Sequence, residues 1–432
     1  MSSTEPTRLT RAGLITSYDD YAKPRSAWRV GAELERHLLR PDGSVVPYFG
    51  EHGVAWILDR LAVQGGWKRY HEGDHLIALE RHGAWITLEP GSQLELSGAP
   101  HHSLDAVRHE AESFDQDLTE VIGDAPILPI TTGYTPFAEV EQIPWVPKQR
   151  YVIMREHLGH TGNLAHHMMK GTAATQATFD FGSEADAAYK VGIATKLGPL
   201  TTAIFANSPL RLGKPTGYMS FRGNIWTHTD PARTGFPEAA TGFTFERWVD
   251  YLLDVPMMFT CHNGHWAAAH GRSFRSWMEQ GIDGTYPDDH DWELHLTSVF
   301  PEVRVKRGIE VRGADCVPHD LSIALVALLK GLLDGVNNHT DAEALAADFF
   351  ALGTKEERFE VACRSGLEGA VGGRTLAAWA SDLLDLADVG LRDVEPRSRP
   401  LLQPLRELVA SGKSPGAALL SDPSILGVAF HT

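Results

Sequence analysis

The chain has 432 residues and a mass of 47.4 kDa, with 43% hydrophobic and 22% charged residues, a composition that predicts a folded soluble protein with a large core and excludes a disordered or fibrous one. Acidic residues outnumber basic ones, 56 to 39, so the net charge of −17 disfavours a general binder of nucleic acid or anionic membrane. The cysteines are few and odd in number, which favours a reducing compartment and no disulfide framework, and we predict a cytoplasmic protein with free thiols at Cys261, Cys316 and Cys363.

Alternating or β-branched stretches predict the strands, and apolar residues at helical spacing predict the helices between them. In chain order, the strands are expected at 28–36, 84–97, 127–132, 172–181 and 302–312. The helices are expected at about 103–123, 184–206, 244–254, 273–280 and 318–335. Because the strands are irregularly separated, the pattern favours an α+β fold around a mostly antiparallel sheet over a regular βαβ alternation.

No Gly/Ser-rich or Pro-rich linker interrupts the stretch from about 25 to 335. We therefore expect an N-terminal tail at 1–24, one large core at 25–337 and a helical C-terminal part at 338–432 packed on that core. The N-terminus lacks the apolar segment of a signal peptide, and the apolar run at 321–336 is too short to span a bilayer. Neither export nor a membrane span is predicted.

Charged residues two apart on predicted strands are the most informative feature, because side chains at i and i+2 point to the same face. Glu33 and Glu35 are spaced in this way, as are Glu310 and Arg312. Carboxylates clustered on a sheet face repel one another unless a cation lies among them, and oxygen ligands without His or Cys suit Mg²⁺ or Mn²⁺. The candidate ligands of two or three such ions are Glu33, Glu35, Glu89, Glu95 and Glu310.

Each Mg²⁺ ion usually binds one or two carboxylates and completes its shell with water and substrate phosphates. The acidic cluster therefore points to a nucleoside triphosphate as co-substrate. The sequence has neither a GxxxxGK[ST] phosphate loop nor a GxGxxG motif after a strand, so the nucleotide must be held in another way. Arg312 is a candidate for stabilising charge on a transferring phosphoryl group. Solvated surface strands would show the same alternation, and this alternative weakens only when all the strands are taken together.

A second polar cluster, SFRGNIWTHTDPARTG, carries Arg222, Trp226 and Arg233. The Asp-Pro and Arg-Thr-Gly sequences predict a turn, and two arginines in one loop can bind the carboxylates of an amino acid through forked hydrogen bonds. A solvated polar loop is the alternative. The segment CHNGHWAAAHG holds one cysteine and three histidines, but their spacing matches no common zinc pattern.

At these same positions the sequence resembles the plant-type and proteobacterial-type glutamate–cysteine ligases. The resemblance covers about 28–335, and the quoted blocks occur in the order of the family: LEPGSQLELSGAP, PKQRYVIM, ATFDFGSEADAAYK, IFANSPL, IWTHTDPARTG, FERWVDYLLDVPM and DWELHLTSVFPEVRVKRGIEVRGAD. It implies the glutamine-synthetase-like carboxylate–amine ligase fold, in which a curved antiparallel sheet forms a funnel flanked by helices. It also implies ATP-dependent joining of the glutamate γ-carboxylate to the amine of L-cysteine through γ-glutamyl phosphate, a step of glutathione biosynthesis.

The resemblance further implies roles for single residues. The metal ligands would be the five glutamates named above, Arg312 would face the transferred phosphate with Glu310 beside it, and Arg222, Trp226 and Arg233 would bind glutamate. The small-molecule partners would be glutamate, cysteine and ATP. A related ligase that joins glutamate to a different amine and a catalytically inactive homologue remain alternatives, and the sequence leaves the oligomeric state and the general base open.

Overall fold

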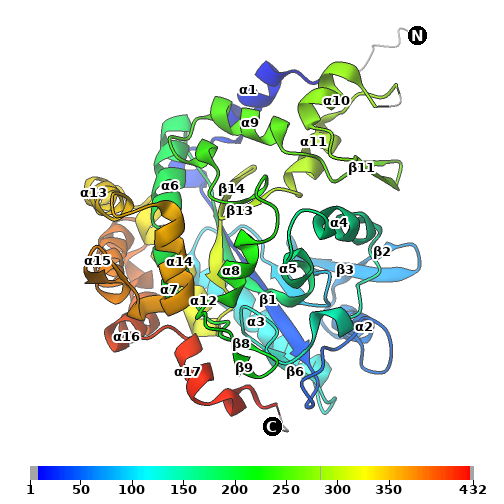
Figure 1. Ribbon diagram of the computed structural model, residues 1–432, viewed down its shortest axis with the longest axis horizontal. Coiled ribbons are helices and arrows are strands. Elements are labelled where there is room, and N and C mark those ends of the chain that lie inside the picture. The colour runs from blue at the N-terminus through cyan, green and yellow to red at the C-terminus, as the bar shows by residue number, and fades with distance from the viewer. Residues whose placement is uncertain (1–7, 283, 429–432) are drawn as a thin grey trace.

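The computed structural model describes residues 8–282 and 284–428, and its centre is a nine-stranded sheet in which every neighbouring pair is antiparallel (Figure 1). Eight strands follow the order β14, β15, β7, β1, β5, β4, β3, β2, and β6 pairs with the C-terminal part of β1. The predicted α+β fold with a mostly antiparallel sheet is confirmed. The strands of this sheet are β1 (Val30–Leu39), β2 (Lys68–Glu72), β3 (His75–Arg81), β4 (Ala84–Leu88), β5 (Leu94–Ser97), β6 (Leu128–Ile130), β7 (Ala174–Phe179), β14 (Val303–Val305) and β15 (Ile309–Asp315).

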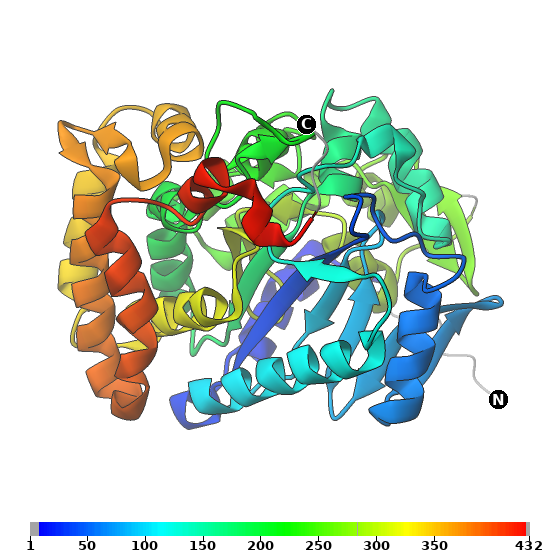
Figure 2. The ribbon, with the colours of Figure 1, turned by 90° about the horizontal axis from the view of Figure 1, so that it is seen from below.

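One face of the sheet is apolar and carries the helices α2 (Val54–Gln64), α3 (Leu104–Ile122) and α12 (His319–Asp334). In β1 the alternate residues Val30 and Leu34 are fully buried on this side. Viewed from below, α2 and α3 lie side by side along this face (Figure 2). Burial of this face leaves the polar residues of the same strands on the opposite face.

Three short helices lie over that opposite face, in front of the sheet in Figure 1: α4 (Gln149–Gly159), α5 (Ala165–Gly171) and α8 (Phe221–Thr227). Glu33 and Glu35 alternate with the buried apolar residues of β1 and therefore point to this side. The polar face of the sheet and these helices enclose the candidate site.

Part of the predicted N-terminal tail is a helix, α1 (Arg11–Tyr21), and residues 1–7 of that tail lie outside the described chain. Helix α1 packs on α9 (Phe245–Asp254): Tyr18 is fully buried and its ring stacks on Phe245, and Arg11 forms an ion pair with Asp250 at 2.6 Å. The polar composition of this stretch hid the helix, because only a few of its residues are buried.

Two predicted strands are in fact hairpins. The stretch 84–97 comprises β4 and β5, joined by a turn in which Ser92 has a φ of +74° and its N–H donates to the Glu89 carbonyl at 3.0 Å. The stretch 302–312 contains β14 and the start of β15. Apolar and polar residues alternate on both sides of each turn, which is why the pattern predicted single strands. The first turn matters for function, because it places Glu89 at the end of β4 beside the cavity described below.

The predicted helix at 184–206 is two helices, α6 (Glu184–Lys196) and α7 (Gly198–Ile204), because Gly198 and Pro199 begin a new helix where the first one ends. The other four predicted helices agree with the structure to within one or two residues: α3, α9, α10 (Phe274–Gln280) and α12. Helices α2 and α4 and the β2–β3 hairpin are additions that the sequence patterns do not predict.

Beyond α12 the chain continues as helices stacked at one side of the molecule, seen at the left of Figure 1. Helix α15 packs against α12 with backbone touching backbone, since a Cβ atom at Gly390 would lie 1.8 Å from the Gly331 carbonyl oxygen. No helix in the described ranges is long and apolar enough to cross a membrane. These helices are α13 (His339–Phe350), α14 (Lys355–Ser365), α15 (Leu376–Val394), α16 (Gln403–Ser411) and α17 (Gly416–Ser421).

Short two-stranded ladders and one further helix complete the regular structure of the described residues. The β10–β13 ladder is parallel and joins the segment after α8 to the segment before β14. These elements are α11 (Asp289–Leu296), β8 (Leu210–Arg211) with β9 (Lys214–Pro215), β10 (Thr234–Gly235) with β13 (Phe300–Pro301), β11 (Phe259–His262) with β12 (His265–Ala268), and β16 (Ala370–Val371) with β17 (Arg374–Thr375).

Candidate active site

Charged and polar side chains of four adjacent strands share the polar face of the sheet. The antiparallel register places Glu35 of β1 directly opposite Glu95 of β5, and Glu33 of β1 opposite Gln176 of β7. Glu310 of β15 follows on the other side of β7. Residues directly opposite in a sheet point to the same side, so the strands assemble an acidic floor from positions far apart in the sequence.

This floor belongs to a cavity of about 270 Å³ whose walls come from α4, α5, α8 and the segment that leads into β14. Four of the five predicted metal ligands line it, as do three of the four predicted arginine and tryptophan residues. The predicted site residues that line the cavity are Glu33, Glu35, Glu89, Glu95, Arg222, Trp226 and Arg312; Glu310 and Arg233 are absent from the lining.

The glutamates on the floor repel one another. Burial and the charges of Glu89 and Glu95 raise the pKa of Glu35 well above its usual range, and burial and the charges of Glu95 and Glu310 raise the pKa of Glu33 to about 7. Glu35 accepts hydrogen bonds from the Ala174 N–H at 2.8 Å and from the Gln176 side-chain amide at 3.2 Å. These neutral donors do not cancel the charge, so the ionised cluster calls for a cation.

The donor set of this cluster suits a hard divalent cation. Mg²⁺ needs only one or two carboxylates when substrate oxygens and water complete its shell, and facing pairs such as Glu35 and Glu95 offer that number. In the part of the chain that the structure describes, no group of three or more His, Cys, Asp or Glu side chains is arranged to hold a metal ion. Two facing carboxylates leave the rest of the shell to substrate oxygens and water, which fits an ion shared with a substrate.

Glu310 differs from the other four glutamates because cations of the protein already neutralise it. Its carboxylate pairs with Arg304 at 2.5 Å and with Lys306 at 2.7 Å, and Arg312 lies at 3.6 Å. Burial disfavours its ionisation, but the charges of Arg304, Lys306 and Arg312 outweigh burial and lower its pKa to about 2. A metal ion could bind Glu310 only by displacing one of these cations.

Arg312 projects from an irregularity in β15. The pairing of β15 with β7 shifts register between Val311 and Ala314, and such bulges redirect a side chain. The Arg312 guanidinium donates to the Gln176 side-chain oxygen, and its side chain is 12% exposed. Arg312 thus reaches over β7 towards the Glu33 row.

Helix α8 positions Arg222 and Trp226 one turn apart on the cavity side, where the sequence predicted a loop. The buried carboxylate of Asp315 accepts from the hydroxyls of Ser208 at 2.6 Å and Ser220 at 2.8 Å, and Ser220 caps the helix. The Arg222 guanidinium donates to the Arg312 carbonyl at 2.9 Å and lies 5.7 Å from the Trp226 ring centroid. Asp315, at the end of β15, therefore ties α8 to the sheet.

Trp226 carries a donor that the protein does not use. Its Nε1 atom is buried, and no described residue accepts a hydrogen bond from it. The same is true of the Arg150 Nε atom, on α4. Buried donors without partners are rare in folded proteins, and two of them at one cavity favour a polar ligand there.

Arg233 does not reach the cavity. Its side chain is fully buried and is held by Asp230 at 2.6 Å, by the carbonyls of Ser298 at 3.1 Å and Pro256 at 2.8 Å, and by His157 at 3.1 Å. These partners occupy the guanidinium, so the predicted direct contact with glutamate does not fit this placement. Arg233 instead joins the β10 segment to α4, α9 and the turn before β13.

Several residues that line the cavity from α4 and the adjoining strands are not identified by the sequence patterns. Arg150, Tyr151 and Met154 face it from α4, and the Tyr151 hydroxyl donates to the Leu88 carbonyl at 2.6 Å. Arg304 lines it from β14. The PKQRYVIM block marks α4, but nothing in its local pattern separates cavity residues from surface residues.

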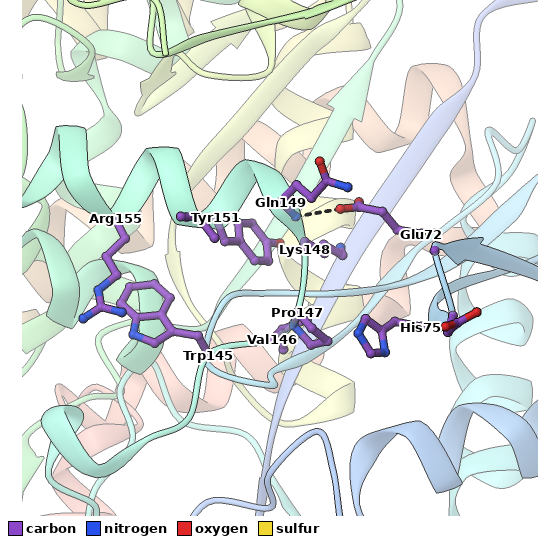
Figure 3. Close-up of a pocket in the computed structure, with 12 residues that line it drawn as sticks. Glu72, His75, Trp145, Val146, Pro147, Lys148, Gln149, Tyr151 and Arg155 are labelled. Carbon is purple, nitrogen blue, oxygen red and sulfur yellow. Dashed lines mark hydrogen bonds between the residues drawn. The ribbon is translucent and has the colours of Figure 1, made fainter. Parts of the chain in front are cut away.

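A second hollow of about 500 Å³ adjoins the cavity and shares Lys148 and Tyr151 with it. Figure 3 shows it between the 145–148 segment, the start of α4 and the β2–β3 hairpin. The Gln149 N–H donates to the Glu72 carboxylate at 2.6 Å, which fixes the hairpin against α4. Burial lowers the pKa of Lys148 to about 8, and its ammonium donates to the Leu88 carbonyl at 2.9 Å.

Comparison with known proteins assigns this arrangement to a family. The profile of Glutamate-cysteine ligase family 2 (GCS2) matches residues 29–425. The chain belongs to this family. Its similarity extends to the chloroplastic glutamate–cysteine ligases of Nicotiana tabacum, 37% identical over 95% of this chain and 79% of the relative, and of Brassica juncea, 37% identical over 97% and 81%.

The fold is also that of a solved ligase. A crystal structure of glutamate–cysteine ligase from Francisella tularensis in complex with AMP has a TM-score of 0.57 at 13% identity, and the match covers 91% of this chain and 84% of that chain. Family membership identifies the protein as a ligase and supports formation of γ-glutamylcysteine.

The same comparisons contradict the predicted cytoplasmic location, which is therefore wrong. The similar plant relatives are chloroplastic enzymes. The prediction rested on few cysteines and on composition. Those features report the redox environment and not the compartment, and a reducing environment is not specific to the cytoplasm.

Proposed function

We propose that this member of the family joins the γ-carboxylate of glutamate to the amine of L-cysteine with consumption of ATP, through γ-glutamyl phosphate. The observation that carries the proposal is the division of charge in one cavity, with glutamates on the sheet floor and Arg222, Arg304 and Arg312 on the walls. A polyphosphate between these two sets would meet guanidinium donors on one side and, on the other, carboxylates that can hold a metal ion.

Two or three Mg²⁺ or Mn²⁺ ions would be held by Glu33, Glu35, Glu89 and Glu95, with Glu310 entering only if a cation leaves it. When bound, such ions offset negative charge on the phosphate oxygens and on the reacting carboxylate. Hydrogen bonds from Ala174 and Gln176 orient the Glu35 carboxylate, and the strand register places Glu95 opposite it.

Arg222 and Trp226 would bind the glutamate substrate. The Arg222 backbone N–H donates to the Ser208 hydroxyl at 3.0 Å, and its guanidinium donates to the Arg312 carbonyl at 2.9 Å. The remaining guanidinium donors are therefore held in place to bind carboxylate oxygens. The unpartnered Nε1 of Trp226 supplies one more donor at the same wall. Arg233 would act only at a distance, by holding the loop after α8.

A carboxylate is a poor acylating agent because its leaving group would be oxide. In the proposed reaction a γ-carboxylate oxygen attacks the γ-phosphorus of ATP, the bond to the bridging oxygen breaks, and ADP leaves. The cysteine amine, after losing a proton, then attacks the acyl carbon and phosphate leaves. Arg312 would stabilise the transferring phosphoryl group, and Arg312→Ala should lower turnover roughly 10²-fold or more while the protein still folds.

The test is product analysis. The purified protein is incubated with glutamate, ATP, Mg²⁺ and an equal mixture of cysteine, 2-aminobutyrate, glycine and alanine, and the products are identified by mass spectrometry. We expect γ-glutamylcysteine as the main peptide, a smaller amount of the 2-aminobutyrate product, and ADP. Another amine in the main product would show that the amine is misassigned, and a peptide product with AMP in place of ADP would show activation by adenylation.

A further inference from the structure

Arg304 lies in a stretch whose sequence pattern does not mark it as a site residue, yet the fold brings it into the cavity. It lies on β14, the last strand at one edge of the sheet, directly opposite Glu310. Its side chain is only 9% exposed. A long charged side chain is seldom buried to this degree without a specific partner or ligand.

The protein fixes the Arg304 guanidinium from one side. Its Nε donates to the Glu310 carboxylate at 2.5 Å, and its Nη1 donates to the Val299 carbonyl at 3.1 Å. No hydrogen bond of its Nη2 group to another described residue is found. Because the guanidinium is planar and is held through Nε and Nη1, the position of its Nη2 group is fixed. A donor with a fixed position is suited to binding an anionic oxygen.

Arg304 is one of three arginines that crowd this wall. Arg304 lies opposite Glu310, the Glu310 carboxylate lies 3.6 Å from Arg312, and the Arg222 guanidinium donates to the Arg312 carbonyl at 2.9 Å. The carboxylates of Glu310 and Asp315 balance part of this positive charge. Positive charges held close together in a buried place favour the binding of an anion. All three arginines line the same cavity, so an anion bound there can meet each of them.

The cavity has two ends. Arg304 lies opposite Glu310, two residues before Arg312 on β15. The Arg222 guanidinium instead donates to the Arg312 carbonyl and lies 4.0 Å from Asp315, further along the same strand. Under the proposed function, glutamate lies at the Arg222 end and the transferred phosphate at Arg312. In-line transfer puts the leaving ADP on the side of the phosphorus opposite to the attacking carboxylate, and that side is the Arg304 end.

We propose that Arg304 binds the phosphates of the nucleotide that remain on ADP, and does not contact glutamate. The inference rests on the proposed function and adds a nucleotide-binding residue to it. Glu310 then has a positioning role, because its carboxylate holds the Arg304 guanidinium in place.

The experiment compares Arg304→Gln with Arg307→Gln. Arg307 is a matched control, since it lies three residues away but its side chain is 71% exposed and pairs with Glu293. Binding of ADP with Mg²⁺ is measured by titration calorimetry without glutamate, and the KM values of ATP and glutamate are measured separately. We expect Arg304→Gln to weaken ADP binding roughly 10- to 100-fold, the scale of a charge-assisted hydrogen bond. The KM of glutamate should stay within about twofold, since Arg304 makes no contact with it, and Arg307→Gln should change neither quantity.

Arg304→Gln should still fold, because Lys306 stays paired with Glu310. If Arg304→Gln does not fold, Arg304→Lys is tested in its place. This variant keeps the positive charge but loses the planar guanidinium, and it should bind ADP several-fold more weakly than the wild type. Unchanged ADP affinity in a folded Arg304 variant, or a raised KM for glutamate alone, overturns the inference and leaves the proposed function intact. A wild-type protein that neither binds ADP nor consumes ATP overturns both.

Discussion

Removal of the Arg233 charge tests whether this residue is part of the protein's frame or of its substrate site. Arg233→Met keeps much of the side-chain volume and deletes the guanidinium. Arg233 is fully buried and Asp230 is 5% exposed, so the substitution leaves Asp230 charged, buried and without its main partner. Breaking a buried pair in this way costs about 3–5 kcal/mol of unfolding free energy, because one charge loses its compensation.

The assay is urea unfolding followed by intrinsic fluorescence at pH 7. The exposed Arg307→Met is the control and should change the unfolding free energy by less than about 0.5 kcal/mol. Asp230→Ala should also lower the free energy of unfolding. In the double variant Asp230→Ala/Arg233→Met the loss should be at least about 1 kcal/mol smaller than the sum of the two single losses, because neither variant residue leaves an unpaired charge behind.

One combination of results would place Arg233 in the substrate site. The free energy of unfolding of Arg233→Met would then lie within about 1 kcal/mol of the wild-type value, and its KM for glutamate would rise tenfold or more. Such results would mean that Arg233 contacts the substrate and that the buried network does not stabilise the fold. We expect the reverse, a large loss of stability with a KM for glutamate changed far less.

Three further predictions concern the metal site, pH and the C-terminal helices. Glu35→Gln should raise the Mg²⁺ concentration for half-maximal activity at least about tenfold, measured in chelator-buffered assays, and an unchanged requirement would remove Glu35 from the metal ligands. Burial lowers the pKa of His295 to about 4, so below pH 6.5 the unfolded chain binds a proton that the folded chain does not. The free energy of unfolding should therefore fall by at most about 3 kcal/mol as the pH drops from 6.5 to 4. His295→Gln should flatten this part of the plot of urea midpoint against pH, and an unaltered plot would contradict a neutral buried His295. Gly390→Ala should cost at least about 1–3 kcal/mol because α12 leaves no room for a methyl group. Gly192→Ala, inside α6 with open space around it, is the control in thermal unfolding and should stabilise the protein by up to about 1 kcal/mol, because alanine favours a helix more than glycine does. Equal behaviour of the two variants would argue against close packing of α12 and α15.

Local rules decide how much of the fold and of the site can be predicted from the sequence. Side chains two apart on a regular strand share a face, so the spacing alone groups Glu33 with Glu35, and both line the cavity. The same spacing groups Glu310 with Arg312, which lie 3.6 Å apart, but only Arg312 lines the cavity. Helices with a clear apolar stripe, such as α3, are predicted almost to the residue because the stripe is also a local pattern.

Features that depend on partners far along the chain cannot be predicted in this way. Arg233 carries the same charge as Arg222, and only the positions of His157, Pro256 and Ser298 decide that it is enclosed. Arg304 lies in a run of basic residues that is typical of a solvated strand, and its burial follows from the β14–β15 register. Local patterns do not encode register, so they cannot separate Arg304 from a surface residue or Arg233 from a substrate-binding one.

The oxygen atoms of glutamate report whether its γ-carboxylate attacks the γ-phosphorus of ATP. Glutamate labelled with ¹⁸O in its γ-carboxylate is incubated with the enzyme, ATP, Mg²⁺ and cysteine, and the released phosphate is analysed by mass spectrometry. Attack of the γ-carboxylate on the γ-phosphorus predicts one ¹⁸O atom in each inorganic phosphate formed, with ADP as the other product. Unlabelled phosphate, or ¹⁸O found in AMP, would contradict activation through γ-glutamyl phosphate.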